Sequence, residues 1–144
     1  MGGTILCGVD WREDSLRAVR VAKQLSDRLG ARLVLAHVAP TPTYPAVSVV
    51  PGGHAELAYL EERDADELLA EIVTAERLGE DVERRIAFGD PAERLTALAA
   101  EEGADFLVVC SRGRRGWRSF LLGSVTAELA ATAPCPVVVV PDRR

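Results

Sequence analysis

The sequence predicts an α/β fold in which an open, five-stranded parallel sheet carries helices on both faces. Five short apolar segments alternate with four segments of helical periodicity, and this alternation is typical of parallel strands joined by helical crossovers. The chain has 144 residues, of which 48% are hydrophobic and 27% are charged. Because that size and composition are typical of one globular domain, we assign residues 1–144 to a single domain.

The first part of the chain predicts two buried strands with a helix between them. Residues 4–9 and 32–38 are short apolar runs, as expected for strands covered on both faces. Asp14-Ser15 offers a helix N-cap, and apolar residues then recur at helical spacing. Gly30 is placed to end that helix.

The middle of the chain predicts an irregular segment, a long helix and an outer strand. Residues 40–54 contain several prolines, and we interpret them as a surface excursion. Residues 56–78 predict an amphipathic helix with Gly79 at its end. Residues 81–87 alternate apolar and polar side chains, which is typical of an outer strand with one partly wet face.

The last part of the chain predicts two further helix–strand pairs. A helix over residues 90–102 opens with Asp-Pro, which suits a first helical turn, and residues 105–110 form the fourth strand. Residues 124–132 predict a short helix, and the fifth strand runs from Pro136 to Val140.

Charge and cysteine content exclude several classes of protein. The net charge of −5 and the pI near 5.1 argue against a nucleic-acid binder. Cys7, Cys110 and Cys135 are too few and too scattered for a metal site, and their apolar neighbours indicate packing residues in a reducing cytoplasm. No apolar run reaches the ~20 residues that span a bilayer, and the amino-terminal residues lack a secretory signal pattern. We therefore expect a cytoplasmic protein.

The candidate ligand site lies beyond the carboxyl ends of the strands, where open parallel sheets bind ligands. Residues 110–124 follow the fourth strand and hold three glycines and four arginines. Glycine-rich backbone followed by a helix N-terminus favours a phosphate, although a surface loop with solubilising arginines is the alternative. Ser124 either caps that helix or offers its hydroxyl to an anion. The pattern is not a Walker loop, because no Gly-Lys-Ser/Thr follows.

In this context the chain resembles the universal stress protein family. Gly113, nine intervening residues, Gly123 and Ser124 are similar to the family's nucleotide loop, Gly-x2-Gly-x9-Gly-Ser/Thr. The opening segment 5–10, the segment 35–38 and the closing segment 133–140 also match, so the resemblance covers essentially the whole chain.

The resemblance implies an adenine nucleotide alpha-hydrolase-like fold, with strand order 3-2-1-4-5, that binds ATP. Family members use the acid after the first strand, here Asp10, near the ribose, and the backbone of Val38 at the adenine edge. Magnesium would be held by the phosphates and water, with Asp10 as the possible carboxylate. The implied nucleotide-binding residues are Gly8, Val9, Asp10, Val38, Val109, Cys110, Arg112, Gly113, Gly123, Ser124, Val125 and Thr126.

Two positions depart from the family pattern. Cys110 stands where the first loop glycine is expected, and a positive φ there would cost about 1–2 kcal/mol. Trp11-Arg12 replaces the usual Gly-Ser after Asp10, so the indole of Trp11 is placed to cover the entrance.

Other polar residues have simpler interpretations. Asp10 has a second possible role as a cap on the turn into the first helix, and His37 is expected to be a core histidine. Glu101 and Glu102 are expected on a solvated helix face. The spacing offers no nucleophile with a base and no paired catalytic carboxylates.

The closing strand predicts a homodimer. In the family's strand order it lies at the edge of the sheet, and an uncharged valine edge invites pairing with a second copy from Pro136 to Val140. We expect an ATP-binding stress-response module that acts as a regulator or sensor with little or no turnover. The alternatives are a dimeric interaction module that binds no nucleotide, and a slow ATP hydrolase or phosphotransferase.

Overall fold

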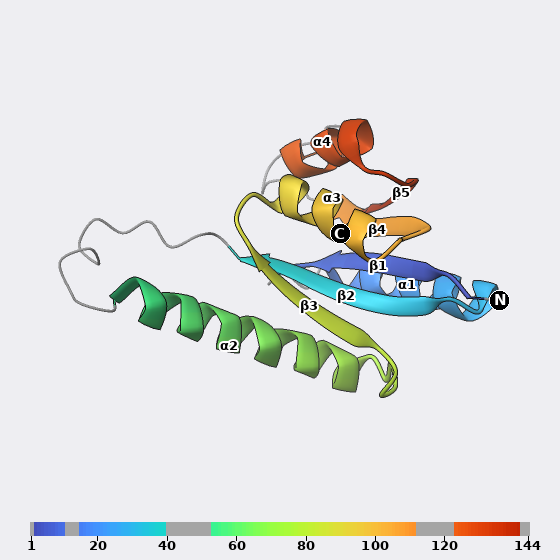
Figure 1. Ribbon diagram of the computed structural model, residues 1–144. Coiled ribbons are helices and arrows are strands. Elements are labelled where there is room, and N and C mark those ends of the chain that lie inside the picture. The colour runs from blue at the N-terminus through green and yellow to red at the C-terminus, as the bar shows by residue number, and fades with distance from the viewer. Residues whose placement is uncertain (1, 11–14, 40–52, 112–122, 142–144) are drawn as a thin grey trace.

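One parallel sheet with the order β3-β2-β1-β4-β5 organises the molecule (Figure 1). The structure, a computed structural model, describes residues 2–10, 15–39, 53–111 and 123–141. The strands within these ranges are β1 (Thr4–Val9), β2 (Arg32–Ala39), β3 (Glu83–Phe88), β4 (Phe106–Ser111) and β5 (Val137–Pro141). The predicted fold class and strand order are confirmed.

Helices cover both faces of the sheet, and the sheet separates the core into two layers. The helices of the described ranges are α1 (Ser15–Leu29), α2 (Gly53–Ala75), α3 (Pro91–Glu101) and α4 (Ser124–Thr132). Val19 of α1 and Leu69 of α2 pack on one face of the sheet, and both are fully buried. Leu95 of α3 and Leu129 of α4 pack on the other face. Side chains of each strand alternate between the two layers, as the strand period of two requires.

The starts and ends of α1, α3 and α4 agree with the predictions to within one residue, and the N-cap candidate Asp14 lies outside the described residues. Asp90 caps α3, because its Oδ2 accepts from the N–H of Glu93 at 2.9 Å. The predicted end of α2 near Gly79 is wrong. Arg77 takes a left-handed φ of 52°, and the N–H of Leu78 donates back to the carbonyl of Val73 at 3.0 Å. This ending buries Leu78 in the core and stops the helix at Ala75.

Three strands lie one or two residues further along the chain than predicted, and β4 is one of them, at 106–111 rather than 105–110. β3 begins at Glu83 rather than residue 81, and it is the outer, half-exposed strand that the alternation indicated. β5 begins at Val137, because the carbonyl of Pro136 accepts from Leu107 before the strand proper. The excursion at 40–54 lies outside the described residues up to residue 52, and α2 already begins at Gly53.

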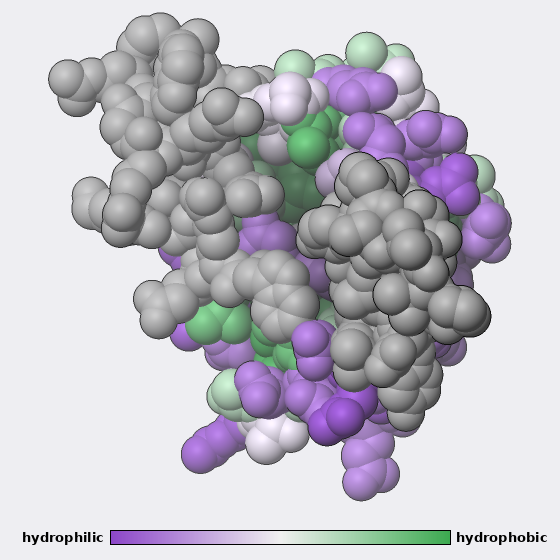
Figure 2. Space-filling model, turned by 90° about the vertical axis from the view of Figure 1, so that its left-hand side faces the viewer, coloured by the Kyte–Doolittle hydropathy of each residue, from purple (hydrophilic) through white to green (hydrophobic). Residues whose placement is uncertain are grey.

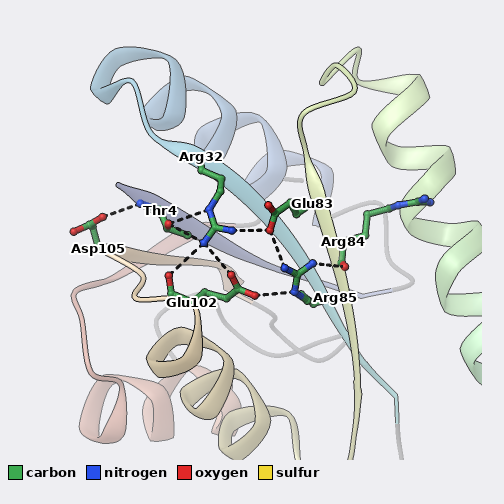
Figure 3. A network of polar contacts seen from close by, with 7 residues as sticks. All are labelled: Thr4, Arg32, Glu83, Arg84, Arg85, Glu102 and Asp105. Atoms are coloured by element: carbon green, nitrogen blue, oxygen red, sulfur yellow. Dashed lines mark hydrogen bonds and ion pairs between the residues drawn. The ribbon is translucent and has the colours of Figure 1, made fainter. Parts of the chain in front are cut away.

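A ring of four charged side chains closes the end of the sheet where the strands begin (Figure 3). Arg32 donates to Glu83 at 2.6 Å and to Glu102 at 2.9 Å. Arg85 donates to the same two carboxylates, at 2.8 Å and 2.7 Å respectively. We name Arg32, Glu83, Arg85 and Glu102 the amino-end ring. It joins the starts of β2 and β3 to the end of α3.

The amino-end ring corrects one expectation from the sequence. The side chain of Glu102 is only 12% exposed, so it does not lie on a solvated helix face, whereas Glu101 is exposed as expected. Asp105 ties the start of β1 to this end of the sheet, because its Oδ2 accepts from the N–H of Thr4 at 2.8 Å.

No helix among the described ranges is long and apolar enough to cross a membrane.

Candidate functional site

A pocket of about 320 Å³ opens at the carboxyl end of the sheet, beside the point where the strand order reverses between β1 and β4. Figure 2 looks onto this end of the molecule and shows apolar surface recessed among hydrophilic residues. All the predicted nucleotide-binding residues that the structure describes line this one pocket: Gly8, Val9, Asp10, Val38, Val109, Cys110, Gly123, Ser124, Val125 and Thr126. The other two, Arg112 and Gly113, lie outside the described residues, as does Trp11.

Four further residues line the pocket that the sequence did not single out: Ser15, Ala36, Pro91 and Leu95. Ala36 and Leu95 occupy regular positions of a strand and a helix, so their pattern is that of core residues. Pro91 opens α3, and Ser15 opens α1, at the same end of the sheet. A helix that follows a parallel strand starts at the carboxyl end of the sheet. The predicted helix starts at Ser15 and Pro91 were therefore the sequence signal that could have placed these two residues at the pocket.

The floor of the pocket is apolar and is shaped by a glycine. A Cβ at Gly8 would lie 3.2 Å from Cδ1 of Leu95 and 3.3 Å from Cγ1 of Val109. The absence of that atom lets Leu95 pack against the sheet. Ala36, the register partner of Gly8, keeps the neighbouring position on β2 small. A flat apolar group therefore has room beside the ends of β1 and β2.

The carbonyl of Val38 faces this floor. β2 extends past β1, whose last paired residue, Val9, lies opposite His37. Ala39 directs its carbonyl toward β3, because it accepts from the N–H of Gly89 at 2.9 Å. Successive residues of a parallel strand direct their backbone groups to opposite sides, so the carbonyl of Val38 points toward the end of β1.

Asp10 and Ser15 lock the turn from β1 into α1. The Oγ of Ser15 accepts from the N–H of Asp10 at 3.0 Å and donates to its Oδ1 at 2.7 Å. Ser15 is 2% exposed, whereas the Asp10 carboxylate lies at the rim of the pocket. The geometry therefore supports the role of Asp10 in holding the turn into α1, and the residue also lines the pocket.

The N-terminus of α4 forms the polar wall. Gly123 occupies the N-cap with a φ of −62°, and it has no side chain with which to cap the helix. Ser124 is therefore the first helical residue and does not cap α4. Thr126 donates its hydroxyl to the carbonyl of Gly123 at 2.8 Å, which fixes the first turn. The leading N–H groups of a helix lack acceptors within it and carry partial positive charge, so this wall favours an anion.

Cys110 fits its position without backbone strain. Among described residues other than glycine, Arg77 alone has a positive φ, so the strain expected at Cys110 is absent. Cys110 is 7% exposed at the inner wall of the pocket. Cys7, Cys110 and Cys135 form no disulfide, and burial raises the pKa of the Cys7 thiol well above its ordinary value.

His37 is buried beneath the pocket, as expected of a core histidine. It is 3% exposed, and its Nδ1 lies 2.8 Å from the carbonyl oxygen of Val9. Because a carbonyl oxygen only accepts, Nδ1 carries the hydrogen. The imidazole thus supports the strand end that leads into Asp10.

The polar side chains of the pocket do not form a metal centre. The described residues contain no group of three or more His, Cys, Asp or Glu side chains that could hold a metal ion. Asp10 is the carboxylate among the lining residues, and the hydroxyls come from Ser15, Ser124 and Thr126. This donor set suits the hydroxyl and phosphate groups of a ligand.

A parallel α/β sheet with a ligand-sized pocket at its switch point defines the broad class of this protein. The chain belongs to the universal stress protein family, whose model matches residues 1–141. A universal stress protein of Thermus aquaticus, from the QAH/OAS sulfhydrylase 3' region, is 35% identical over 147 residues. That match covers 95% of this chain and 97% of the relative.

Solved structures of similar proteins cover nearly the whole chain. Hypothetical protein MJ0577, whose biochemical function was assigned from its structure, superposes with a TM-score of 0.81 at 26% identity, covering 99% of this chain and 97% of that one. A universal stress protein solved in complex with cAMP is 32% identical, with a TM-score of 0.61 and coverage of 96% and 95%.

Proposed function

We propose that this protein binds an adenine nucleotide, with ATP as the expected ligand, and acts as a stress-response regulator or sensor with little or no turnover. The observation that carries the proposal is the pocket at the carboxyl end of the sheet, which gathers every described residue that the family resemblance implied. Its volume of about 320 Å³ is that of a small-molecule site, at the lower end of the usual range.

The lining residues fit the three parts of a nucleotide. The apolar floor beside Gly8 and Leu95 suits a base, and the carbonyl of Val38 would accept a hydrogen bond from the amino group of adenine. Asp10 is the acceptor for a ribose hydroxyl. The N-terminus of α4 is the wall for the phosphates. The relative solved with cAMP supports the same class of ligand.

The direct test is to identify and titrate the ligand. Denaturing freshly purified protein and analysing the released small molecules is expected to yield an adenine nucleotide. Calorimetric titration of nucleotide-free protein with ATP, AMP and cAMP then ranks the three. A protein that releases no nucleotide and gives no heat with any of them at millimolar concentration would contradict the proposal and leave a dimeric interaction module.

Little turnover is expected because the described pocket residues supply one carboxylate, Asp10, and no second base beside it. Asp10 would contact magnesium only together with the phosphates and water. Incubation with Mg-ATP is expected to produce ADP slowly or not at all. Steady ADP release that Asp10→Asn abolishes while binding persists would instead identify a slow ATP hydrolase.

The partner of this module is a second copy of the chain, paired along β5. This strand lies at the edge of the sheet, carries no charge, and leaves Val137, Val138 and Val139 half-buried. Such an edge is stabilised when another strand covers it. Sedimentation is expected to give a dimer at micromolar concentration, and a monomer would contradict this part of the proposal. The cytoplasmic location, expected because the three cysteines form no disulfide, belongs to the same proposal.

A further inference from the structure

The floor of the pocket depends on one contact between β1 and α3. Gly8 lies on β1, and the position its Cβ would occupy is 3.2 Å from Cδ1 and 3.5 Å from Cδ2 of Leu95. Both distances are shorter than, or at the limit of, ordinary carbon contacts. Leu95 is 5% exposed, and it both belongs to the core layer and lines the pocket.

We infer that Gly8 and Leu95 together set the width of the pocket floor and so determine which ring-substituted adenine nucleotides the protein accepts. The inference rests on the proposed function and names a specificity device within that site. Val109 bounds the floor on the other side, since its Cγ1 lies 3.3 Å from the same Cβ position.

Leu95 is the neighbour that would move if Gly8 gained a side chain. Val109 belongs to β4 and pairs with Val139 of β5, so its short, β-branched side chain stands on a strand held by its neighbour. Leu95 reaches the sheet from a helix with the far end of a flexible side chain, and the open space beside it is the pocket. A methyl group at residue 8 would therefore push the leucine into the volume that the base needs.

A pair of substitutions that keeps the number of side-chain carbon atoms constant tests the coupling between Gly8 and Leu95. Gly8→Ala is expected to weaken binding of the wild-type ligand about tenfold, because the displaced leucine narrows the floor. Gly8→Ala/Leu95→Val adds one carbon to the strand and removes one from the helix, and it removes both clashing Cδ atoms. The double variant is expected to recover most of the lost affinity.

Gly2→Ala is the matched control, because a Cβ at Gly2 meets nothing within 4 Å. Its affinity is expected to stay within about twofold of the wild type. Melting temperatures of the four proteins without nucleotide test the contact itself. Gly8→Ala is expected to lower the melting temperature, and Leu95→Val in that background is expected to restore part of it.

Selectivity provides the second readout. Leu95→Val alone widens the floor, so it is expected to bind at least one of N6-benzyl-, 2-methylthio- and 8-bromo-AMP more tightly relative to AMP than the wild type does. A gain of about tenfold in that ratio supports the inference.

The outcomes separate the two proposals. If the wild type binds no adenine nucleotide, both the proposed function and this inference fail. If the wild type binds but Gly8→Ala binds equally well, or the double variant recovers nothing, or Leu95→Val leaves every ratio unchanged, the inference alone is overturned.

Discussion

The two ends of the sheet are built from different kinds of residue. At the amino end, the long charged side chains of the amino-end ring reach across three elements and pair with one another (Figure 3). At the carboxyl end, short residues such as Gly8, Ala36 and Gly123 leave a pocket bordered by backbone groups. The contrast indicates that one end holds the elements together, while the other leaves the space that the proposed ligand would fill.

Substituting Glu102, the least exposed side chain of the amino-end ring, is expected to have the largest effect on stability. Glu102→Ala removes one of the two carboxylates that Arg32 and Arg85 share and leaves Glu83 as the other. We expect a loss of about 1–2 kcal/mol in the free energy of unfolding, because Glu102 is mostly buried while the arginines are partly solvated. Chemical denaturation measures this loss.

Glu101→Ala is the matched control, since Glu101 is the exposed neighbour on the same helix. It is expected to leave stability almost unchanged. Nucleotide affinity is expected to be equal in both variants and the wild type. An affinity that falls together with stability in Glu102→Ala would show that the two ends are not independent.

The next effect is expected at the wall of the pocket. Thr126→Val keeps the shape of the side chain but removes the hydrogen bond to Gly123, which costs about 1 kcal/mol of stability. The first turn of α4 is then less firmly held, and nucleotide affinity is expected to fall. Thr126→Ser retains the hydroxyl and is expected to behave more like the wild type in both calorimetry and denaturation. Equal affinity in all three proteins would contradict a role for this turn in binding.

Lowering the pH is expected to have a smaller effect on stability, through Glu83 of the amino-end ring. The hydrogen bond from Arg32 holds the pKa of Glu83 below its ordinary value of 4.5. Glu83 therefore contributes stability that is fully present above pH 4.5 and is lost as the pH falls through the lower folded pKa. Denaturation of the wild type and Glu83→Gln from pH 7 to pH 3 is expected to show a difference that shrinks with acidity. A constant difference would contradict the assignment.

The three cysteines are expected to be alkylated at different rates. Cys135 is half-buried and is expected to react first, although burial and Asp105 raise the pKa of its thiol. Cys110 follows through the pocket, and fully buried Cys7 reacts last. Nucleotide is expected to slow alkylation of Cys110 while leaving Cys135 unchanged, as followed by mass spectrometry. Protection of Cys135 instead would move the ligand away from the pocket.

The sequence predicted the carboxyl end better than the amino end. Strand ends and helix starts carry local signals, and the family resemblance implies Asp10, Val38 and Gly123 as nucleotide-binding residues, so the three could be grouped before the pocket was known. Leu95 escaped notice because its spacing on α3 is that of any core residue. Its place in the pocket and its contact with the Cβ position of Gly8, on a distant strand, became visible only in the structure.

The amino-end ring had no sequence signal at all. Arg32, Glu83 and Glu102 lie far apart in the chain, and each alone resembles an ordinary surface charge. Sheet register and the end of α3 bring them together, so the pairing is a product of tertiary structure. The left-handed conformation of Arg77 also had no sequence signal, since Gly79 two residues later has a positive φ as well and Leu78 between them is buried.

The most direct test of the account is to map amide chemical shifts while titrating the protein with ATP. Shifts are expected at the carboxyl end, in Gly8, Asp10, Val38 and the first turn of α4, with the amides of Thr4, Arg32 and Glu83 unmoved. Perturbations confined to the amino end, or a spectrum that ATP leaves unchanged, would contradict the claim that this protein binds a nucleotide where its strands finish.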